Sequence, residues 1–507
     1  MAARRISQRR SRTRLRSTPG DPAPPADRGR GPAGVVRADR RVGSPTRADL
    51  QDRRGRQDHR GHPGTAARDR HLTRPHLSGG PGLAIRRFAA GAARHRHHRR
   101  RRGPARHGRG RVLRVLRPLP LPSGPAVLDR LDDLRALLAG EASFAPVPDD
   151  PREQELLTGA FGIGTGIDDD VVLVIATSGS TGTPKGSQHT AATLTASAQA
   201  TATHLGGAGA WLLALPPHHI AGLQVLLRSL AAGFTPAVLD LAAGFHPDAF
   251  ADALEALDGP RRYTSLVPTQ LRKALDSPRA VAALTGVDAL LVGGAATPPA
   301  LLHKAIDAGI PIVRTYGMSE TAGGCVYDGI PLDGVQIEIV DAGPDGVGRV
   351  SLSGPMVAQG YRLLPDHPAF AHAGGFRTDD LGRVVDGVLQ ITGRADEAIS
   401  TGGLTVVPQV VEAVIADDPA VAECAVVGVA DERLGEKVVA VVVPEPGMTV
   451  DAHRIQDAVT DRLGRYAAPR EVVTVAALPL RGPGKIDRRA LRASLWPPAS
   501  SPATGIG

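Results

Sequence analysis

Six apolar residues, Val171–Ala176, lead directly into a loop of glycine and hydroxyl-bearing residues. The apolar run is short, rich in β-branched residues and free of charge, which predicts a buried strand. Small residues after such a strand allow backbone N–H groups to approach phosphate oxygens, and a lysine adds positive charge. A flexible linker seldom follows a buried strand, so we predict a phosphate-binding loop. It reads Thr177-Ser178-Gly179-Ser180-Thr181-Gly182-Thr183-Pro184-Lys185-Gly186.

The glycine spacing of this loop differs from that of a Walker A loop, in which serine or threonine follows the lysine. Here Gly186 follows Lys185. A second glycine cluster, at residues 162–166, resembles a dinucleotide-binding loop only superficially, because it follows no clear strand and opens no helix. We interpret that cluster as a surface loop.

The first part of the chain has a composition unlike the rest. Residues 1–117 contain 33 Arg and 7 Asp but neither Lys nor Glu, and the whole 507-residue chain carries a formal charge of +10. Phe88 is the single aromatic residue among residues 1–110, and so little apolar surface predicts disorder. We therefore separate residues 1–111, as an Arg-rich segment, from the folded protein.

Three interpretations of the Arg-rich segment remain open. Basic runs such as residues 98–102 would neutralise phosphates, which is typical of a nucleic-acid-binding arm. The segment could instead be a solvated tail without a function. The absence of Lys and Glu, with abundant Arg, Gly, Pro and Ala, favours a third interpretation, an out-of-frame reading of GC-rich DNA that is not natively translated. We favour the third interpretation, and a nucleic-acid partner is the least favoured.

Two further features narrow the class of protein. Two cysteines, Cys325 and Cys424, exclude a disulfide framework and a multi-cysteine zinc site. No uninterrupted apolar run reaches the roughly 18 residues of a membrane span, and no apolar core follows the N-terminal arginines as in a secretory signal. We therefore expect a cytoplasmic protein without a membrane span.

From residue 112 onward, the hydrophobic pattern predicts consecutive parts. Strand-like and helix-like segments alternate up to about residue 340, which is typical of an α/β sheet with crossover helices. Short strands with Asp-Gly turns follow. A compact piece with βαββαβ character begins near residue 396. We assign residues 112–394 to an N-terminal domain, 395–493 to a C-terminal domain and 494–507 to a loose tail.

Further motifs follow the glycine-rich loop. They are Gly293-Gly294-Ala295, Tyr316-Gly317-Met318-Ser319-Glu320-Thr321, Thr378-Asp379-Asp380, Gly393-Arg394-Ala395-Asp396, Gly402-Gly403 and Arg481-Gly482-Pro483-Gly484-Lys485. Together with the loop, and in this order, they resemble the adenylate-forming (acyl-CoA synthetase) superfamily over roughly residues 171–490. The resemblance implies an α/β fold, with a large N-terminal domain that includes a β-rich subdomain and a small mobile α+β C-terminal domain.

The resemblance also implies the nucleotide and metal contacts. Ser319 is implied to contact the α-phosphate of ATP, and Asp380 and Arg394 to bind the ribose. Glu320 and Thr181 are the implied ligands of Mg²⁺, which prefers hard oxygen donors. The other implied nucleotide-binding residues are Thr177, Ser178, Gly179, Ser180, Gly182, Thr183, Lys185, Gly293, Gly294, Ala295 and Tyr316.

The family's reaction has two steps, and the resemblance implies both for this chain. A carboxylate attacks the α-phosphate of ATP to give an acyl-adenylate and pyrophosphate, and the thiol of coenzyme A then displaces AMP. Lys485 is the implied catalytic lysine, whose ammonium stabilises the pentacoordinate phosphate. Asp396 is the implied pivot of a domain rotation that brings Gly402 and Gly403 to the pantetheine channel.

Residues 215–228 and 403–412 carry a narrower resemblance, to the o-succinylbenzoate–CoA ligases of menaquinone biosynthesis in their short actinobacterial form. It places His219 near the acyl pocket, as a catalytic and substrate-binding candidate. The substrate of those enzymes carries a second carboxylate, which an arginine in an apolar pocket would bind. Arg228 is the candidate, and a guanidinium that reaches the surface is the alternative. Two alternative functions remain, another aryl- or short acyl-CoA ligase and a nucleic-acid-binding protein.

Overall fold

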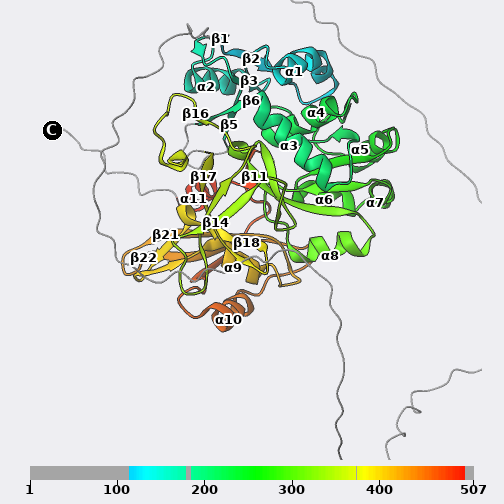
Figure 1. Ribbon diagram of the computed structural model, residues 1–507. Helices are drawn as coiled ribbons and strands as arrows, with labels where there is room; N and C mark the ends of the chain where they lie inside the picture. Colours follow the sequence, from blue (N-terminus) through cyan, green and yellow to red (C-terminus); the bar gives the residue numbers. More distant parts are fainter. Residues whose placement is uncertain (1–113, 178–183, 373, 483, 497–507) are drawn as a thin grey trace, which may run out of the picture. The chain divides into compact units, whose positions relative to one another are not determined.

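The computed structural model describes residues 114–177, 184–372, 374–482 and 484–496. The chain divides into two units, residues 1–102 and 103–507, and every described residue belongs to the second unit. The predicted Arg-rich segment therefore lies outside the described residues, as does most of the predicted tail. The described part is a mixed α/β protein with a large N-terminal domain and a smaller C-terminal domain, as the sequence predicts (Figure 1).

The larger sheet of the N-terminal domain has seven strands in the order β13-β12-β11-β10-β9-β7-β8. Strands β8, β7, β9, β10 and β11 run parallel, and β12 and β13 join them antiparallel. Parallel neighbours need crossover connections, which explains the alternating strand and helix patterns of the sequence. The strands are β7 (Ala210–Leu213), β8 (Ala237–Val238), β9 (Arg262–Leu266), β10 (Ala289–Val292), β11 (Ile312–Met318), β12 (Gly323–Tyr327) and β13 (Ile330–Pro331).

Both faces of this sheet are buried. Leu212 and Leu290 pack in one hydrophobic cluster with α5 to α8, whereas their neighbours Leu213 and Leu291 pack in a second cluster with α1, α3 and α4. Successive strand residues point to opposite faces, so β7 and β10, which are buried on both faces, are apolar throughout. Within the described ranges, none of the helices has the length and apolar composition needed to cross a membrane. The helices are α1 (Leu131–Leu138), α2 (Pro151–Phe161), α3 (Ala191–His204), α4 (Ile220–Ala231), α5 (Pro247–Glu255), α6 (Pro268–Leu275), α7 (Pro278–Thr285) and α8 (Pro299–Asp307).

A second, five-stranded sheet contains the predicted buried strand. Its order is β16-β6-β5-β3-β2, and the first five residues of β5 are at most 1% exposed. Gly162 ends α2 in the left-handed conformation, and the residues after it are half-buried or exposed up to Gly166, as expected of a surface loop. The strands are β2 (Arg117–Pro120), β3 (Phe144–Val147), β5 (Val171–Ala176), β6 (Gly186–Thr190) and β16 (Gly360–Tyr361), and a separate pair joins β1 (Arg114–Val115) to β4 (Gly166–Ile167).

The β-rich subdomain is a four-stranded antiparallel sheet in the order β14-β15-β17-β18. Asp386 and Gly387 form the two-residue turn between β17 and β18, both with positive φ, as a type I′ hairpin turn requires. The predicted domain boundary falls at the end of β18, where a 3₁₀ turn, Ala395–Glu397, follows. The strands are β14 (Gln336–Val340), β15 (Gly348–Ser353), β17 (Gly375–Val385) and β18 (Val388–Arg394).

The C-terminal elements, coloured orange to red in Figure 1, follow the predicted βαββαβ order from β20 to β23. Val426 and Ala440 pack with α9 and α10 in one cluster, and Val427 and Val439 pack with Leu491 of α11 in another. The elements are β19 (Ile399–Thr401), β20 (Leu404–Val406), α9 (Pro408–Ile415), β21 (Val421–Asp431), β22 (Gly435–Pro444), α10 (Ala452–Leu463), β23 (Glu471–Thr474), β24 (Leu480–Arg481), β25 (Lys485–Ile486) and α11 (Arg488–Leu495).

Candidate active site

The glycine-rich loop is held at its ends by backbone contacts. It connects β5 to β6, which pair antiparallel, and the Thr177 N–H donates to the Lys185 carbonyl at 2.9 Å. The Thr177 hydroxyl is buried and has no hydrogen-bond partner among the described residues. Residues 178–183, which include the implied metal ligand Thr181, lie outside the described residues. The paired strands therefore hold the two ends of the predicted phosphate-binding loop together.

The motif around Ser319 begins in a strand and ends in a tight turn. Strand β11 contains its first three residues, and a 3₁₀ turn, Ser319–Thr321, contains the last three. The Ser319 hydroxyl donates to the Ala176 carbonyl at 2.7 Å. Two motifs that lie 143 residues apart in the sequence thus meet at the end of β5, beside the glycine-rich loop.

His189, which the sequence pattern did not single out, holds the same turn. Its side chain is fully buried, and its Nε2 lies 2.6 Å from the Ser319 carbonyl oxygen. A carbonyl oxygen can only accept, so Nε2 carries the proton. Burial lowers the pKa of His189 to about 4, which keeps the ring neutral at neutral pH. Because His189 lies in β6, four residues after Lys185, it connects the strand of the glycine-rich loop to the Ser319 turn.

Glu320 is buried against a second residue that the sequence pattern missed, Tyr361. The Tyr361 hydroxyl donates to Glu320 Oε1 at 2.5 Å, and the Lys185 ammonium lies over the same ring, 4.7 Å from its centroid. Burial raises the pKa of Glu320, and the Tyr361 hydroxyl, Lys185 and Lys485 oppose this rise. One aromatic side chain therefore links an implied metal ligand to an implied phosphate ligand. In the sequence, Tyr361 is marked only by the glycine that precedes it, Gly360, and this pair forms the short strand β16.

The described residues fit Mg²⁺ through a single carboxylate. Within the described ranges, no group of three or more His, Cys, Asp or Glu side chains could hold a metal ion. In nucleotide sites, Mg²⁺ is usually bound by one or two carboxylates together with phosphate oxygens. Glu320 supplies one hard oxygen donor beside the base of the glycine-rich loop. A site with this one carboxylate is therefore better suited to a Mg²⁺ ion that binds together with a nucleotide than to a metal ion that is held by protein side chains alone.

The implied ribose-binding residues touch one another. The Asp380 carboxylate accepts hydrogen bonds from the Tyr316 hydroxyl at 2.7 Å and from Arg394 Nη1 at 3.1 Å. Burial raises the pKa of Asp380, and Arg394 and Tyr316 oppose the rise. Arg394 also makes two hydrogen bonds of 2.9 Å to Asp396, the implied pivot. Residues from three separate motifs therefore form one polar cluster with a carboxylate at its centre.

Asp379, where the family has glycine, does not strain the backbone. It lies within the extended strand β17 and is not among the residues with positive φ. Its carboxylate accepts a hydrogen bond of 3.2 Å from Arg349. The backbone conformation at this position therefore does not require a glycine.

Local backbone geometry explains why glycine occupies the other glycine motifs. A Cβ atom at Gly293 would lie 2.2 Å from the Thr315 hydroxyl oxygen, so no side chain fits there. Gly402 and Gly403 have φ values of 59° and 80° and form the turn between β19 and β20. The Gly402 N–H donates to the Leu434 carbonyl, within the C-terminal domain. In the described part of the chain, no hydrogen bond joins this turn to Glu320 or Asp380.

Lys485 lies among residues of the N-terminal domain. It is half-buried in β25, and burial together with Arg394 and Arg481 lowers its pKa, whereas Glu320 and Asp380 oppose this. The hairpin that carries it packs beside His219, because a Cβ atom at Gly482 would lie 3.8 Å from His219 Nε2. The implied catalytic lysine thus stands near the implied metal and ribose ligands.

His219 occupies the N-cap position of α4, without a capping hydrogen bond from its side chain, and is neutral. Burial, followed by His218 and Lys485, lowers its pKa to about 3. The His218 and His219 rings lie 4.3 Å apart between centroids. A neutral imidazole can donate or accept a hydrogen bond beside Lys485 without adding charge.

Arg228 is buried, in contrast to the alternative in which its guanidinium reaches the surface. Its side chain is 7% exposed, its Nη2 donates to the Tyr327 hydroxyl at 3.3 Å, and its guanidinium lies 5.3 Å from the Trp211 ring centroid. Among the described residues, the guanidinium of Arg228 hydrogen-bonds to the Tyr327 hydroxyl and not to a carboxylate, and its Nε has no hydrogen-bond partner. A buried guanidinium surrounded by aromatic side chains can bind an anion strongly.

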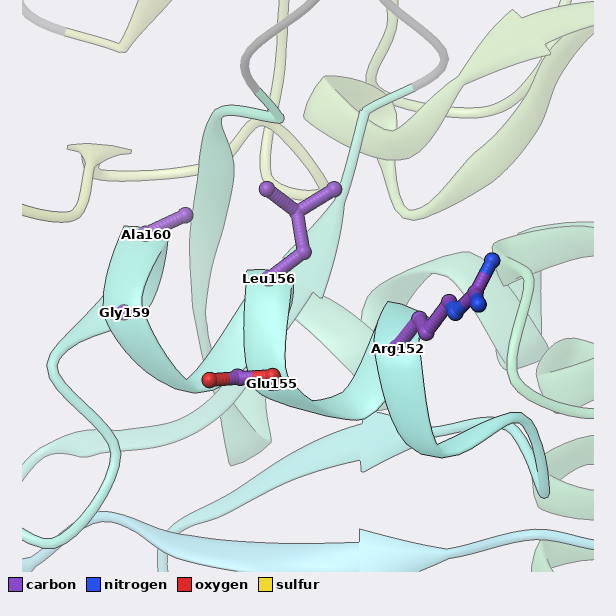
Figure 2. A pocket seen from close by; sticks show the side chains of 5 residues that line it. All are labelled: Arg152, Glu155, Leu156, Gly159 and Ala160. Atoms are coloured by element: carbon purple, nitrogen blue, oxygen red, sulfur yellow. The ribbon is translucent and has the colours of Figure 1, made fainter.

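Figure 2 shows the side chains of helix α2 that line a depression on its surface. Helix α2 contributes no implied site residue, and the lining is the surface of one helix. We therefore assign no role to this depression. Its lining residues are Arg152, Glu155, Leu156, Gly159 and Ala160.

Comparison with known proteins identifies the family. Residues 127–362 match the sequence model of the AMP-binding enzyme family. Residues 410–485 match the sequence model of the AMP-binding enzyme C-terminal domain. The probable 2-succinylbenzoate–CoA ligase of Mycobacterium tuberculosis strain H37Rv is 51% identical over 74% of this chain and 97% of its own length. The indoleacetate–CoA ligase of Aromatoleum aromaticum is 33% identical over 63% of this chain and 66% of its own length.

Solved structures share the fold. The o-succinylbenzoate CoA synthetase from Bacillus subtilis, in complex with an acyl-adenylate intermediate, matches with a TM-score of 0.64 and 24% identity. The match covers 75% of this chain and 89% of that one. The order of the motifs, the family models and the identity to curated CoA ligases agree. The chain therefore belongs to the family of AMP-binding enzymes and is an adenylate-forming acid–thiol ligase.

Proposed function

We propose that this ligase is an ATP-dependent o-succinylbenzoate–CoA ligase of menaquinone biosynthesis. The observation that carries the proposal is the buried guanidinium of Arg228, which has no carboxylate partner within the described ranges. A buried charge is costly unless it is paired. A substrate with a second carboxylate would supply that partner. The name and the 51% identity of the mycobacterial relative support this choice of acid.

In the first half-reaction, the acid attacks the α-phosphate of ATP and pyrophosphate leaves. Lys485 stabilises the negative charge that develops on the phosphate. Ser319 binds the α-phosphate at the end of β5, and Asp380 binds the ribose hydroxyls. Mg²⁺, held by Glu320 and Thr181, would neutralise charge on the phosphates. The hydrogen bond from Arg394 to Asp380, and the electrostatic effect of Arg394, Glu320 and Asp380 on the pKa of Lys485, support a single site for these roles.

In the second half-reaction, the thiol of coenzyme A attacks the acyl-adenylate and AMP leaves. Residues 395–493 rotate about Asp396, so that Lys485 withdraws and the Gly402–Gly403 turn lines the pantetheine channel. The position of both features within the same C-terminal domain supports this exchange, because one rotation moves them together. His219 remains in the N-terminal domain and lines the acyl pocket as a neutral hydrogen-bonding group.

A panel of acids tests the proposal. AMP release is measured with ATP, Mg²⁺ and coenzyme A for o-succinylbenzoate, benzoate, indoleacetate and short aliphatic acids. The proposal expects o-succinylbenzoate to have the highest kcat/KM. A preference for a monocarboxylic acid would contradict it and would favour another aryl- or short acyl-CoA ligase, for which the resemblance to indoleacetate–CoA ligase is the specific support.

The proposed substrates define the binding partners and the cellular location that we expect for this enzyme. ATP, coenzyme A and a small carboxylic acid are the partners, and they point to the cytoplasm. A nucleic-acid partner would require the Arg-rich segment, and salt-sensitive DNA binding that disappears when residues 1–110 are deleted would support it.

A further inference from the structure

A charged network within the C-terminal domain is centred on Arg488. Arg488 pairs with Glu412 at 2.5 Å and with Glu397 at 3.2 Å, and the three side chains are each 14–15% exposed. Glu412 also accepts a hydrogen bond of 2.7 Å from the Val426 N–H. One guanidinium therefore joins two carboxylates that come from different segments of the chain.

The network fixes the start of the helix that follows Lys485. Arg488 is the first residue of α11, and only Asp487 separates it from the strand β25. The hairpin of β24 and β25 contains two residue pairs, Leu480 with Ile486 and Arg481 with Lys485, and forms a sheet of its own. A hairpin of this size is marginally stable alone, so its orientation depends on the residues that anchor it.

The other end of the network reaches the domain boundary. Gln409 Nε2 donates to Glu397 at 2.5 Å, and Gln409 Oε1 accepts from the Arg394 N–H at 3.3 Å. Arg394 in turn pairs with Asp380, the implied ribose ligand. A continuous series of polar contacts therefore runs from the helix after Lys485 to the ribose side of the site.

A buried network of this kind is a poor source of stability, because the desolvation of its charges offsets their attraction. Its geometric effect is more specific, since paired groups with bidentate or branched contacts hold one arrangement. The rate of an adenylation step depends on the position of Lys485 to within about 1 Å. The fixed geometry of the network and the sensitivity of adenylation to the position of Lys485 together favour a role for the network in orienting Lys485.

We propose that Arg488 is a positioning residue, which uses Glu412 and Glu397 to fix the Lys485 hairpin to the domain boundary for adenylation. This inference rests on the role proposed for Lys485. Arg488, Glu412 and Glu397 all follow the boundary, so their contacts persist when the domain rotates. The Gln409–Arg394 contact crosses the boundary and is the one that rotation breaks. The network should therefore affect the step that uses Lys485 and spare the step that does not.

Two variants test the inference, Arg488→Lys and Glu397→Gln. Both retain side-chain volume, and Glu397→Gln leaves the Arg488–Glu412 pair in place, so the domain is expected to fold. Adenylate formation is measured as acid-dependent pyrophosphate release, with whichever acid the panel ranks first. Thioester formation is measured separately, from synthetic acyl-adenylate and coenzyme A. We expect adenylate formation to fall about 10- to 100-fold and thioester formation to change less than about twofold.

Two further variants make the result interpretable. Arg462→Gln removes an exposed ion pair with Asp417 in the same domain and should change neither half-reaction. Lys485→Ala, measured in parallel, tests the role on which the inference depends. If Lys485→Ala leaves adenylation intact, the proposed role of Lys485 and this inference both fail. If Lys485→Ala abolishes adenylation but Arg488→Lys and Glu397→Gln do not reduce it, or reduce both half-reactions equally, only the positioning inference fails.

Discussion

The Tyr361 hydroxyl donates a hydrogen bond of 2.5 Å to Glu320, a residue 41 positions earlier in the chain. The face of the same ring lies 4.7 Å from the Lys185 ammonium. Tyr361 is 3% exposed and is packed edge-on against His367 and Phe370, so its ring has little freedom to move. Its rigid position holds the carboxylate and the ammonium at a fixed separation.

Replacing Tyr361 tests this arrangement. Tyr361→Phe removes the hydroxyl and retains the ring, so we expect the KM for ATP to rise about 10-fold, since a hydrogen bond to a charged group is lost. Tyr361→Leu also removes the contact with Lys185 and should weaken ATP binding further. ATP binding by calorimetry and pyrophosphate release give the two measurements. Tyr466→Phe, at a side chain that is 46% exposed, is the matched control, and equal behaviour of the two Phe variants would contradict the prediction.

Lys485→Ala separates the two half-reactions. Removal of one preorganised positive group from a developing oxyanion costs about 10²- to 10³-fold in rate, so adenylate formation should fall by this factor. Thioester formation from preformed adenylate should change little, because the proposed domain rotation withdraws Lys485 before that step. Single-turnover assays of each step provide the measurement. Equal losses in both steps would refute the role proposed for Lys485.

Arg228→Ala is expected to alter substrate preference. The KM for o-succinylbenzoate should rise roughly 10- to 100-fold, because a charge-assisted hydrogen bond to the second carboxylate is lost. The KM for a benzoate-like monoacid should stay within about twofold, since that acid has no second carboxylate. The ratio of the two KM values is the readout, and a parallel rise for both acids would indicate damage to the pocket instead.

His189 makes the fold sensitive to acid. Its pKa is about 4 in the folded protein against 6.5 for an unperturbed histidine, so the folded state resists protonation. A lowered folded-state pKa contributes stability that is present above pH 6.5 and is lost as the pH falls toward 4. The full loss would be about 3 kcal/mol. The free energy of unfolding, measured by urea denaturation from pH 7 to pH 4, should therefore fall steeply.

His189→Gln isolates this contribution. Glutamine can still donate to the Ser319 carbonyl but does not titrate, so the variant should show a shallower pH dependence than the unmodified protein. His303→Gln, at an exposed position in α8, should leave the slope unchanged. Identical slopes for the unmodified protein and the His189 variant would show that another group controls the acid response.

Deletion of residues 1–110 should leave the ligase activity intact. Every residue of the candidate site lies between Thr177 and Lys485, and the first described strand starts at Arg114. Steady-state kinetics of the truncated chain with ATP and coenzyme A provide the test. An inactive but folded truncation would show that the Arg-rich segment takes part in catalysis or in completing the N-terminal domain.

Local patterns predicted much of this fold. The apolar run of β5, the alternation of strands and helices and the Asp386–Gly387 turn require only the chemistry of neighbouring residues. The order of the motifs, compared with a known superfamily, then implied the site residues. Each of these features depends on residues that are close together in the sequence, where hydrophobic periodicity and turn chemistry act.

Tertiary structure decided which residues touch. His189 reaches Ser319 across 130 positions, and Tyr361 reaches Glu320 from a separate strand. Neither contact leaves a periodic signal, because a buried polar side chain is placed by the packing of distant elements and not by its neighbours in the sequence. The same reason applies to Arg228, whose burial between Trp211 and Tyr327 the helical pattern of α4 alone could not specify. The sequence determined the elements and their motifs, and the long-range packing determined the partners of each charged group.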